Sequence, residues 1–210
     1  MERLEQIADE IRNHMEEINA ARDTAYQRSR QLTRVCARTI RAIHREEWDL
    51  AGELMDEARA AAQAMVRDVE PYPELYYAGY TQDALKEYVE ANLTYVLVRD
   101  EPLRGPQELG VEMNTWLNGL AEAGTELRRR ILDIIRHGYN EEVERLLDIM
   151  DEIYSVLVTF DFSDSITGGL RRRTDVLRSV LERTRGDVTT SLRQTELETA
   201  LEALERRLGE

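Results

Sequence analysis

The sequence has one cysteine, four prolines and a single lysine, and these scarcities restrict the structures it can form. A lone cysteine cannot close an intramolecular disulfide, so we expect Cys36 to be a small buried residue in a reducing, cytoplasmic setting. No apolar run approaches the ~18 residues of a membrane-spanning helix, and the first residues do not resemble a signal peptide, so no membrane partner is expected. With 42% apolar and 33% charged residues, the composition favours a helical bundle over a sheet protein.

Positive charge is also scarce. The chain has 42 acidic and 28 basic residues, which give a net charge of −14, and Lys86 is its only lysine. Abundant Asp and Glu with arginine in place of lysine resembles the halophilic-type composition of proteins adapted to high salt, in which net charge maintains solubility. We therefore attribute the overall acidity to the environment, and local departures from it to function.

Apolar periodicity predicts an all-α bundle of seven long amphipathic helices in one domain, residues 1–210. The expected helices cover residues 3–46, 48–69, 74–98, 107–137, 140–159, 168–185 and 187–208. Pro71 and Pro73 separate the second helix from the third, because proline lacks an amide hydrogen. Gly110 loosens the fourth helix, and Gly186 separates the last two. Asn140 is suited to cap the fifth.

One segment departs from the acidic background, since residues 24–45 contain no Asp or Glu. On a helix with about 100° per residue, five of its arginines fall within an arc of roughly 80° and extend over about 22 Å. This arginine ridge consists of Arg30, Arg34, Arg38, Arg41 and Arg45. A long cationic ridge on an acidic protein suits a polyanion such as RNA. In the alternative interpretation, the same arginines pair with acids on neighbouring helices.

Two pairs of carboxylates have helical spacing. Glu87 and Glu90 are three residues apart and Glu122 and Glu126 four, so each pair shares one face of its helix. On antiparallel helices they could together hold Mg²⁺ or Mn²⁺, which prefer hard oxygen ligands and activate water for attack on phosphorus. Such pairs are common in a sequence this acidic, so spacing alone leaves open that they are solvated.

Other polar residues have two open interpretations. The three histidines form no ligand motif and are expected to be solvated, although His44 could reach nucleic acid from the ridge helix. A second basic cluster could either contact RNA or form salt bridges within the bundle. It consists of Arg171, Arg172, Arg173 and Arg178.

The stretch from Tyr72 to Ala91 resembles the translin family, which includes translin and translin-associated factor X. The segment Glu87-Tyr88-Val89-Glu90-Ala91 is the most specific part of the match. The resemblance continues through residues 109–129 and 170–178, so it covers most of the chain in order.

This resemblance implies a seven-helix fold and a closed homo-oligomer, often an octamer, that encloses RNA. In the factor X branch, acids on two helices form a metal-dependent endoribonuclease centre. These acids match Glu87, Glu90 and Glu122 as ligands of Mg²⁺ or Mn²⁺, with Glu126 as an adjacent supporting acid. The family commonly has Asp at the position of Glu122, so this side chain is one methylene longer. Family RNA contacts include basic residues of the first helix, where the arginine ridge lies.

The resemblance thus favours an endoribonuclease acting on short or single-stranded RNA, and two alternatives remain. The first is a non-catalytic oligomer that binds single-stranded RNA or DNA. The second is an all-α nucleoside triphosphate pyrophosphohydrolase, whose metal site also uses a Glu-x-x-Glu pair. The proline and tyrosine residues of the segment 72–80 are not part of that enzyme's pattern.

Overall fold

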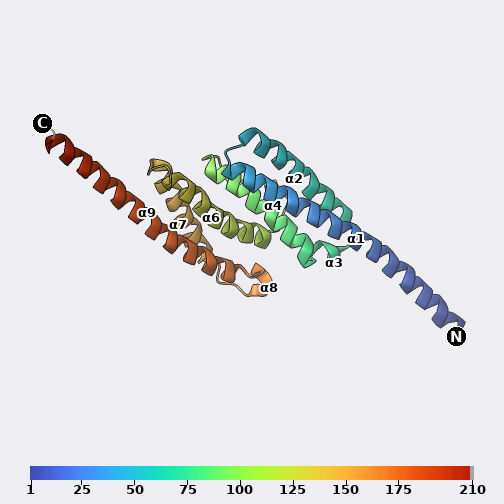
Figure 1. The fold of residues 1–210 in the computed structure, drawn as a ribbon. Coiled ribbons are helices and arrows are strands. Elements are labelled where there is room, and N and C mark those ends of the chain that lie inside the picture. Colours follow the sequence, from blue (N-terminus) through green and yellow to red (C-terminus); the bar gives the residue numbers. More distant parts are fainter. Residues whose placement is uncertain (209–210) are drawn as a thin grey trace.

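The structure, a computed structural model, describes residues 1–208. Within this range the chain forms nine helices and no strand, which confirms the all-α prediction (Figure 1). The helices are α1 (Glu2–His44), α2 (Trp48–Val69), α3 (Pro73–Tyr76), α4 (Gly79–Val98), α5 (Pro106–Leu109), α6 (Met113–Ile135), α7 (Glu141–Leu157), α8 (Asp164–Thr167) and α9 (Leu170–Leu208). None of these described helices is both long and apolar enough to cross a membrane.

Helix α4 lies at the centre of the bundle. It packs against α1 and α2 on one side and against α6 on the other, and α6 in turn packs against α7 and α9 (Figure 1). Residues 88–94 are all buried, so this part of α4 has no solvent-exposed face. The long helices share one apolar core, which includes the free thiol of Cys36 as expected. A carboxylate on α4 therefore lies close to the core, where charge is costly unless it is compensated.

The third predicted helix, 74–98, is two helices. The chain leaves helical geometry after α3 because side chains of the next helix bind its last carbonyl groups. The Thr81 hydroxyl donates to the Leu75 carbonyl at 2.7 Å, and the Gln82 amide donates to the Tyr76 carbonyl at 2.8 Å. These contacts end α3 and allow α4 to start at Gly79.

Two other boundaries depend on glycine. Gly110 adopts the left-handed conformation with φ of 66°, so the fourth predicted helix is divided into α5 and α6. The predicted break at Gly186 was wrong, because α9 is continuous through it. One glycine costs a helix only about 1 kcal/mol relative to alanine, and Val188 is buried beyond it, so packing holds the helix together. The Asn140 cap is confirmed, since its side chain accepts from the Val143 amide at 3.3 Å.

The two longest helices project from opposite ends of the bundle (Figure 1). No residue before Ala25 in α1 is buried, and none is buried between 189 and 208 in α9. Both projecting segments carry exposed apolar side chains at helical spacing. These are Leu4, Ile7, Ile11 and Met15 in α1, and Leu197, Leu201, Leu204 and Leu208 in α9.

Gly119 sets the distance between α4 and α6. A Cβ atom at this position would lie 2.5 Å from Val89 Cγ1 and 3.1 Å from the Lys86 carbonyl oxygen. Both distances are shorter than ordinary van der Waals contact, so any side chain at position 119 would push the helices apart. The glycine thus allows the acids of α4 and α6 to approach one another.

We predict that Gly119→Ala destabilises the protein by about 1–3 kcal/mol, because the added methyl group overpacks the contact with Val89. Urea unfolding measures this free energy. Gly52→Ala is the matched control, since Gly52 lies in α2 with nothing within 4 Å of an added Cβ. That control should be neutral or stabilising by up to about 1 kcal/mol. Equal destabilisation by the two changes would show that the close approach is not what Gly119 provides.

Candidate functional site

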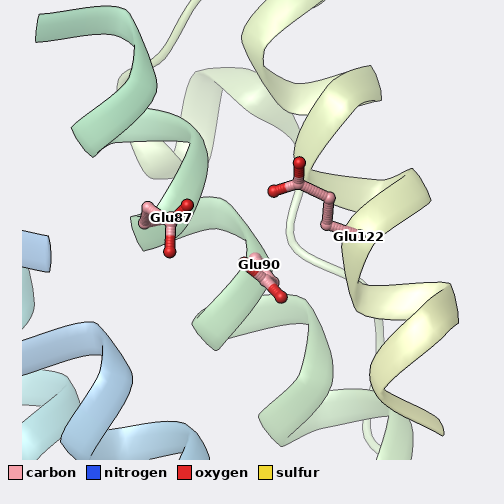
Figure 2. A group of neighbouring side chains, drawn as sticks. All are labelled: Glu87, Glu90 and Glu122. Carbon is pink, nitrogen blue, oxygen red and sulfur yellow. The ribbon is translucent and has the colours of Figure 1, made fainter. Parts of the chain in front are cut away.

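Three carboxylates meet between α4 and α6, near the close contact at Gly119. Glu87 and Glu90 extend from α4 and Glu122 from α6, and all three point into the same space (Figure 2). One oxygen from each lies within 4.8 Å of the others. Glu90 is buried, with 8% exposure, whereas Glu87 and Glu122 are half-buried. The spacing noted in the sequence therefore corresponds to one cluster rather than to separate solvated faces.

Burial makes Glu90 the least stable charge of the cluster. Its pKa is raised to about 8, first because burial removes the carboxylate from water, and then because Glu87, Glu122 and Glu126 repel its charge. Lys86 acts in the opposite direction. A cation placed among these oxygens would favour the charged form.

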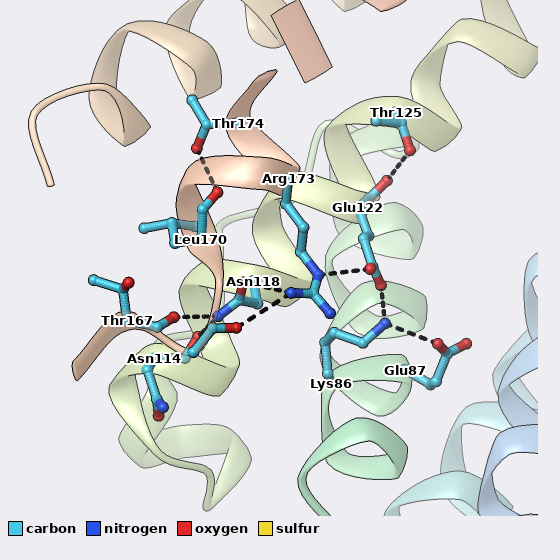
Figure 3. A network of polar contacts seen from close by, with 11 residues as sticks. Lys86, Glu87, Asn114, Asn118, Glu122, Thr125, Thr167, Leu170, Arg173 and Thr174 are labelled. Carbon is cyan, nitrogen blue, oxygen red and sulfur yellow. Dashed lines mark hydrogen bonds and ion pairs between the residues drawn. The ribbon is translucent and has the colours of Figure 1, made fainter. Parts of the chain in front are cut away.

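Two basic side chains contact the cluster (Figure 3). The Lys86 ammonium donates to Glu87 Oε1 at 2.9 Å and to Glu122 Oε2. Although burial lowers the pKa of Lys86, its hydrogen bonds to Glu122 and Glu87 outweigh this effect and raise it. From α9, Arg173 Nε donates to Glu122 Oε1 at 2.9 Å, and Arg173 Nη1 to Asn118 Oδ1 at 3.1 Å. Glu122 is thus held between a lysine and an arginine.

Glu126 lies beside this cluster and has a different partner. Its Oε2 atom is 2.6 Å from Nε2 of His44, whose side chain is only 1% exposed. The expectation that His44 is solvated was wrong, because the last turn of α1 packs against the core. The other ring nitrogen of His44, Nδ1, has no hydrogen-bond partner among residues 1–208. The His44–Glu126 pair therefore places an ionisable histidine behind the cluster.

The arginine ridge is exposed along its whole length. All five of its residues are exposed, and among residues 1–208 the only ion pair that they form joins Arg38 to Glu57 at 3.9 Å. Pairing with acids on neighbouring helices therefore explains one arginine of the ridge and leaves the other four unexplained.

One pocket connects the ridge to the carboxylates. It has a volume of about 580 Å³ and lies between α1 and α4. Arg30 and Arg34 line it from α1, and Lys86 and Glu87 line it from α4. An anion in this pocket would meet both the ridge and the edge of the carboxylate cluster.

The second basic cluster is divided between two environments. Arg173 binds Glu122, and Arg178 lies 3.3 Å from Glu182 on its own helix. Arg171 and Arg172 are exposed. The salt-bridge interpretation thus applies to two of the four residues.

Helical spacing predicts the acids but not the basic residues that contact them. Lys86 stands out in the sequence only as the single lysine, and Arg173 only as one member of a basic run. That Lys86 is the only lysine could have marked it as a functional residue. The contact of His44 with Glu126 could not be foreseen, because it joins segments far apart in the sequence. These partners act on the acids from α1, α4 and α9.

The cluster fits a divalent cation. Its three donors are carboxylates, which suit Mg²⁺ or Mn²⁺. Opposite ligands of Mg²⁺ lie about 4.2 Å apart, so small side-chain rotations would bring oxygens now within 4.8 Å of one another into range. The extra methylene of Glu122, relative to the expected Asp, does not keep its carboxylate out of the cluster. Glu87, Glu90 and Glu122 could therefore hold the ion.

Comparisons with known proteins agree on the fold. No protein-family model matches the chain. An uncharacterised protein of Methanocaldococcus jannaschii is 30% identical over 188 residues, which span 88% of this chain and 82% of that protein. In its complex with duplex RNA, AfC3PO superposes on this chain with a TM-score of 0.81 and 32% sequence identity. The match covers 87% of this chain and 95% of the AfC3PO chain. A structure of AfC3PO alone gives the same values. Apo-NeC3PO, at 19% identity and a TM-score of 0.79, shares the fold.

We predict that Glu90→Gln raises the melting temperature in EDTA at pH 8. Because the pKa of Glu90 is raised from 4.5 to about 8, its neutral form stabilises the fold at low pH, and this contribution is lost as pH rises toward 8. Glutamine retains the neutral state, so its advantage should shrink at pH 5. Each kcal/mol corresponds to about 2–4 °C in a protein of this size.

Thermal melting with and without Mg²⁺ completes this test. Mg²⁺ should raise the melting temperature of the wild type and have little effect on Glu90→Gln, which lacks one ligand. Glu53→Gln, at an exposed position of α2, is the matched control and should leave both values unchanged. A lower melting temperature for Glu90→Gln in EDTA at pH 8 would mean that the Glu90 charge is already compensated.

Proposed function

Because the chain belongs to the translin family, we propose that it binds RNA as a homo-oligomer and cleaves it with a bound divalent cation. The observation that carries this proposal is the pocket shared by Arg30, Arg34 and Glu87. It brings a surface suited to phosphate next to carboxylates suited to Mg²⁺ or Mn²⁺. The AfC3PO structure with duplex RNA supports RNA as the ligand, since that protein is 32% identical over most of this chain.

The arginine ridge would bind the RNA backbone. Exposed guanidinium groups donate charge-assisted, often bidentate hydrogen bonds to phosphate oxygens. Such contacts position a strand without selecting its sequence. Four of the five ridge arginines have no ion pair within residues 1–208, so binding RNA there would break few existing contacts.

The carboxylates would bind the cation and position the reacting groups. Glu87, Glu90 and Glu122 would be its ligands, and Arg173 would orient Glu122 through the contact at 2.9 Å. When bound, the cation would polarise the phosphodiester and lower the pKa of a nearby water molecule. Glu126 would accept a proton at a carboxylate oxygen, with His44 holding that carboxylate in place.

A homo-oligomer is supported by the projecting parts of α1 and α9. Their exposed leucine, isoleucine and methionine side chains form stripes that no described residue covers. Apolar stripes of this kind are typical of interfaces, and a second copy of the chain supplies matching ones. An octamer is the assembly that the family resemblance implies. Native mass spectrometry that detected only monomers would contradict this part of the proposal.

A second candidate is a binding-only protein of the same family. It is favoured by the contacts of Lys86 and Arg173, which already neutralise part of the carboxylate charge. In that case the pocket would bind RNA, or single-stranded DNA, without cleavage. Because the chain belongs to the translin family, we do not retain the nucleoside triphosphate pyrophosphohydrolase alternative.

We predict that Arg30→Glu/Arg34→Glu weakens RNA binding by at least about tenfold at moderate salt, because two phosphate contacts become repulsive. Filter binding with labelled single-stranded and duplex RNA measures the affinity. Arg129→Glu/Arg136→Glu is the matched control, since it makes the same charge change at two exposed residues, one in α6 and one directly after it. It should cost much less affinity. Equal losses of affinity in the two variants would mean that only the net charge of the protein matters. The arginine ridge would then not be the RNA-binding surface.

We also predict that Glu87→Gln/Glu90→Gln lowers Mg²⁺-dependent RNA cleavage by at least about 100-fold and leaves RNA binding intact, because it removes two ligands. End-labelled RNA incubated with Mg²⁺ or with EDTA, and resolved on a denaturing gel, gives the rate. Glu53→Gln should cleave at the wild-type rate. RNA that stays intact with the wild type while remaining bound would favour the binding-only candidate.

A further inference from the structure

The Lys86 ammonium lies between two of the three carboxylates that could hold a metal ion. Its ammonium is the donor shared by Glu87 and Glu122, the acids that the two helices contribute from opposite sides (Figure 3). Lys86 is only 8% exposed, so this contact is part of the interior. A divalent ion held by Glu87, Glu90 and Glu122 would draw on the same two carboxylates. The ammonium and the ion would therefore compete for them.

The charges of the cluster lead to the same conclusion. Glu87, Glu90 and Glu122 carry three negative charges when ionised. A divalent cation among them would place two positive charges close to the ammonium of Lys86, which already contacts Glu87 and Glu122. Like charges a few ångströms apart in a partly buried site repel strongly.

Arg173 is held by more hydrogen bonds than Lys86. Arg173 also donates to Asn118 and to the Gly168 carbonyl, which fix its guanidinium. Lys86 has a flexible stem of four carbons and lines the open pocket that contains Arg30 and Arg34. Rotation of its side chain would exchange these carboxylate partners for a place in the pocket, which the acid Asp83 also lines.

We propose that Lys86 is an exchangeable counter-ion of the metal centre. Without metal, its ammonium neutralises Glu87 and Glu122. When a divalent cation takes these carboxylates, the ammonium moves into the pocket between α1 and α4 and becomes a contact for RNA phosphate. This inference rests on the metal site of the proposed function. The side chain of Lys86 would thus link the binding of the cation to the binding of RNA.

Titration calorimetry with Mn²⁺ alone tests the competition. Lys86→Met should bind Mn²⁺ at least about tenfold more tightly than the wild type, because the cation no longer displaces an ammonium. Lys86→Gln is a second variant, in case the methionine protein does not fold. Equal affinities in variant and wild type would overturn the inference and leave the nuclease proposal standing.

Two other outcomes separate the inference from the proposed function. If neither protein binds Mn²⁺, both the exchange and the metal-dependent nuclease are wrong. If only the Lys86 variants bind Mn²⁺, the competition is supported and the nuclease proposal fails, because the wild-type lysine then keeps the cation out.

Amine labelling of the unaltered protein tests the movement directly. Lys86 is the only lysine, so N-succinimidyl acetate can modify only its side chain and the amino terminus, and mass spectrometry distinguishes these sites. Labelling of Lys86 should be slow in EDTA, several-fold faster with Mg²⁺, and slow again when RNA is added. The amino terminus is the internal control and should not respond to Mg²⁺. A rate of Lys86 labelling that is independent of Mg²⁺ would overturn the proposed movement, whatever the variants show.

Discussion

The contact between Gly119 and Val89 allows α6 to lie against α4, and the arrangement of the carboxylates depends on it. Besides Val89, the atom that limits this approach is the Lys86 carbonyl oxygen, 3.1 Å from where a Cβ at position 119 would lie. This contact therefore includes the backbone of the residue whose ammonium joins Glu87 to Glu122. A wider separation of α4 and α6 would move Glu122 away from both Lys86 and Glu87. Packing and charge compensation are thus determined at the same point of the bundle.

Among residues 1–208, buried charges have partners or a shifted pKa, whereas many exposed charges have no partner. The free-energy cost of desolvation explains this difference. An unpaired charge costs little at the surface and several kcal/mol in the interior. The exposed arginines of the ridge therefore remain almost without partners, although the chain has an excess of acids. Glu122, near the interior, has two cationic partners, and Glu90, which is buried, has a raised pKa instead. The interior cluster favours a cation, and the exposed ridge favours an anion.

Local sequence patterns predicted the parts of the structure that depend on local interactions. The bounds of α1, α2 and α7 agree with the predictions to within two residues, because apolar periodicity determines them, together with the Asn140 cap of α7. Glu87 and Glu90 share a face by spacing alone, whereas spacing left their meeting with Glu122 open and the family resemblance implied it. The break before Gly79 was not predictable, since it depends on side chains that reach back six residues. The burial of His44 was missed for a similar reason, because Glu126 lies 82 residues away.

Opposite charges lie on adjacent helices here without neutralising one another, and the side chains between them explain this. Arg30 and Arg34 line the pocket together with Glu87, yet Glu87 already accepts a hydrogen bond from Lys86. At the same pocket, the rings of Tyr26 and Tyr80 pack edge to face with centroids 5.7 Å apart, which joins α1 to the start of α4 through an apolar contact. The arginines are thus not needed to hold these helices together. Since Lys86 also binds Glu122, which does not line the pocket, a polyanion bound by the arginines would be coupled to the inner carboxylates through this lysine.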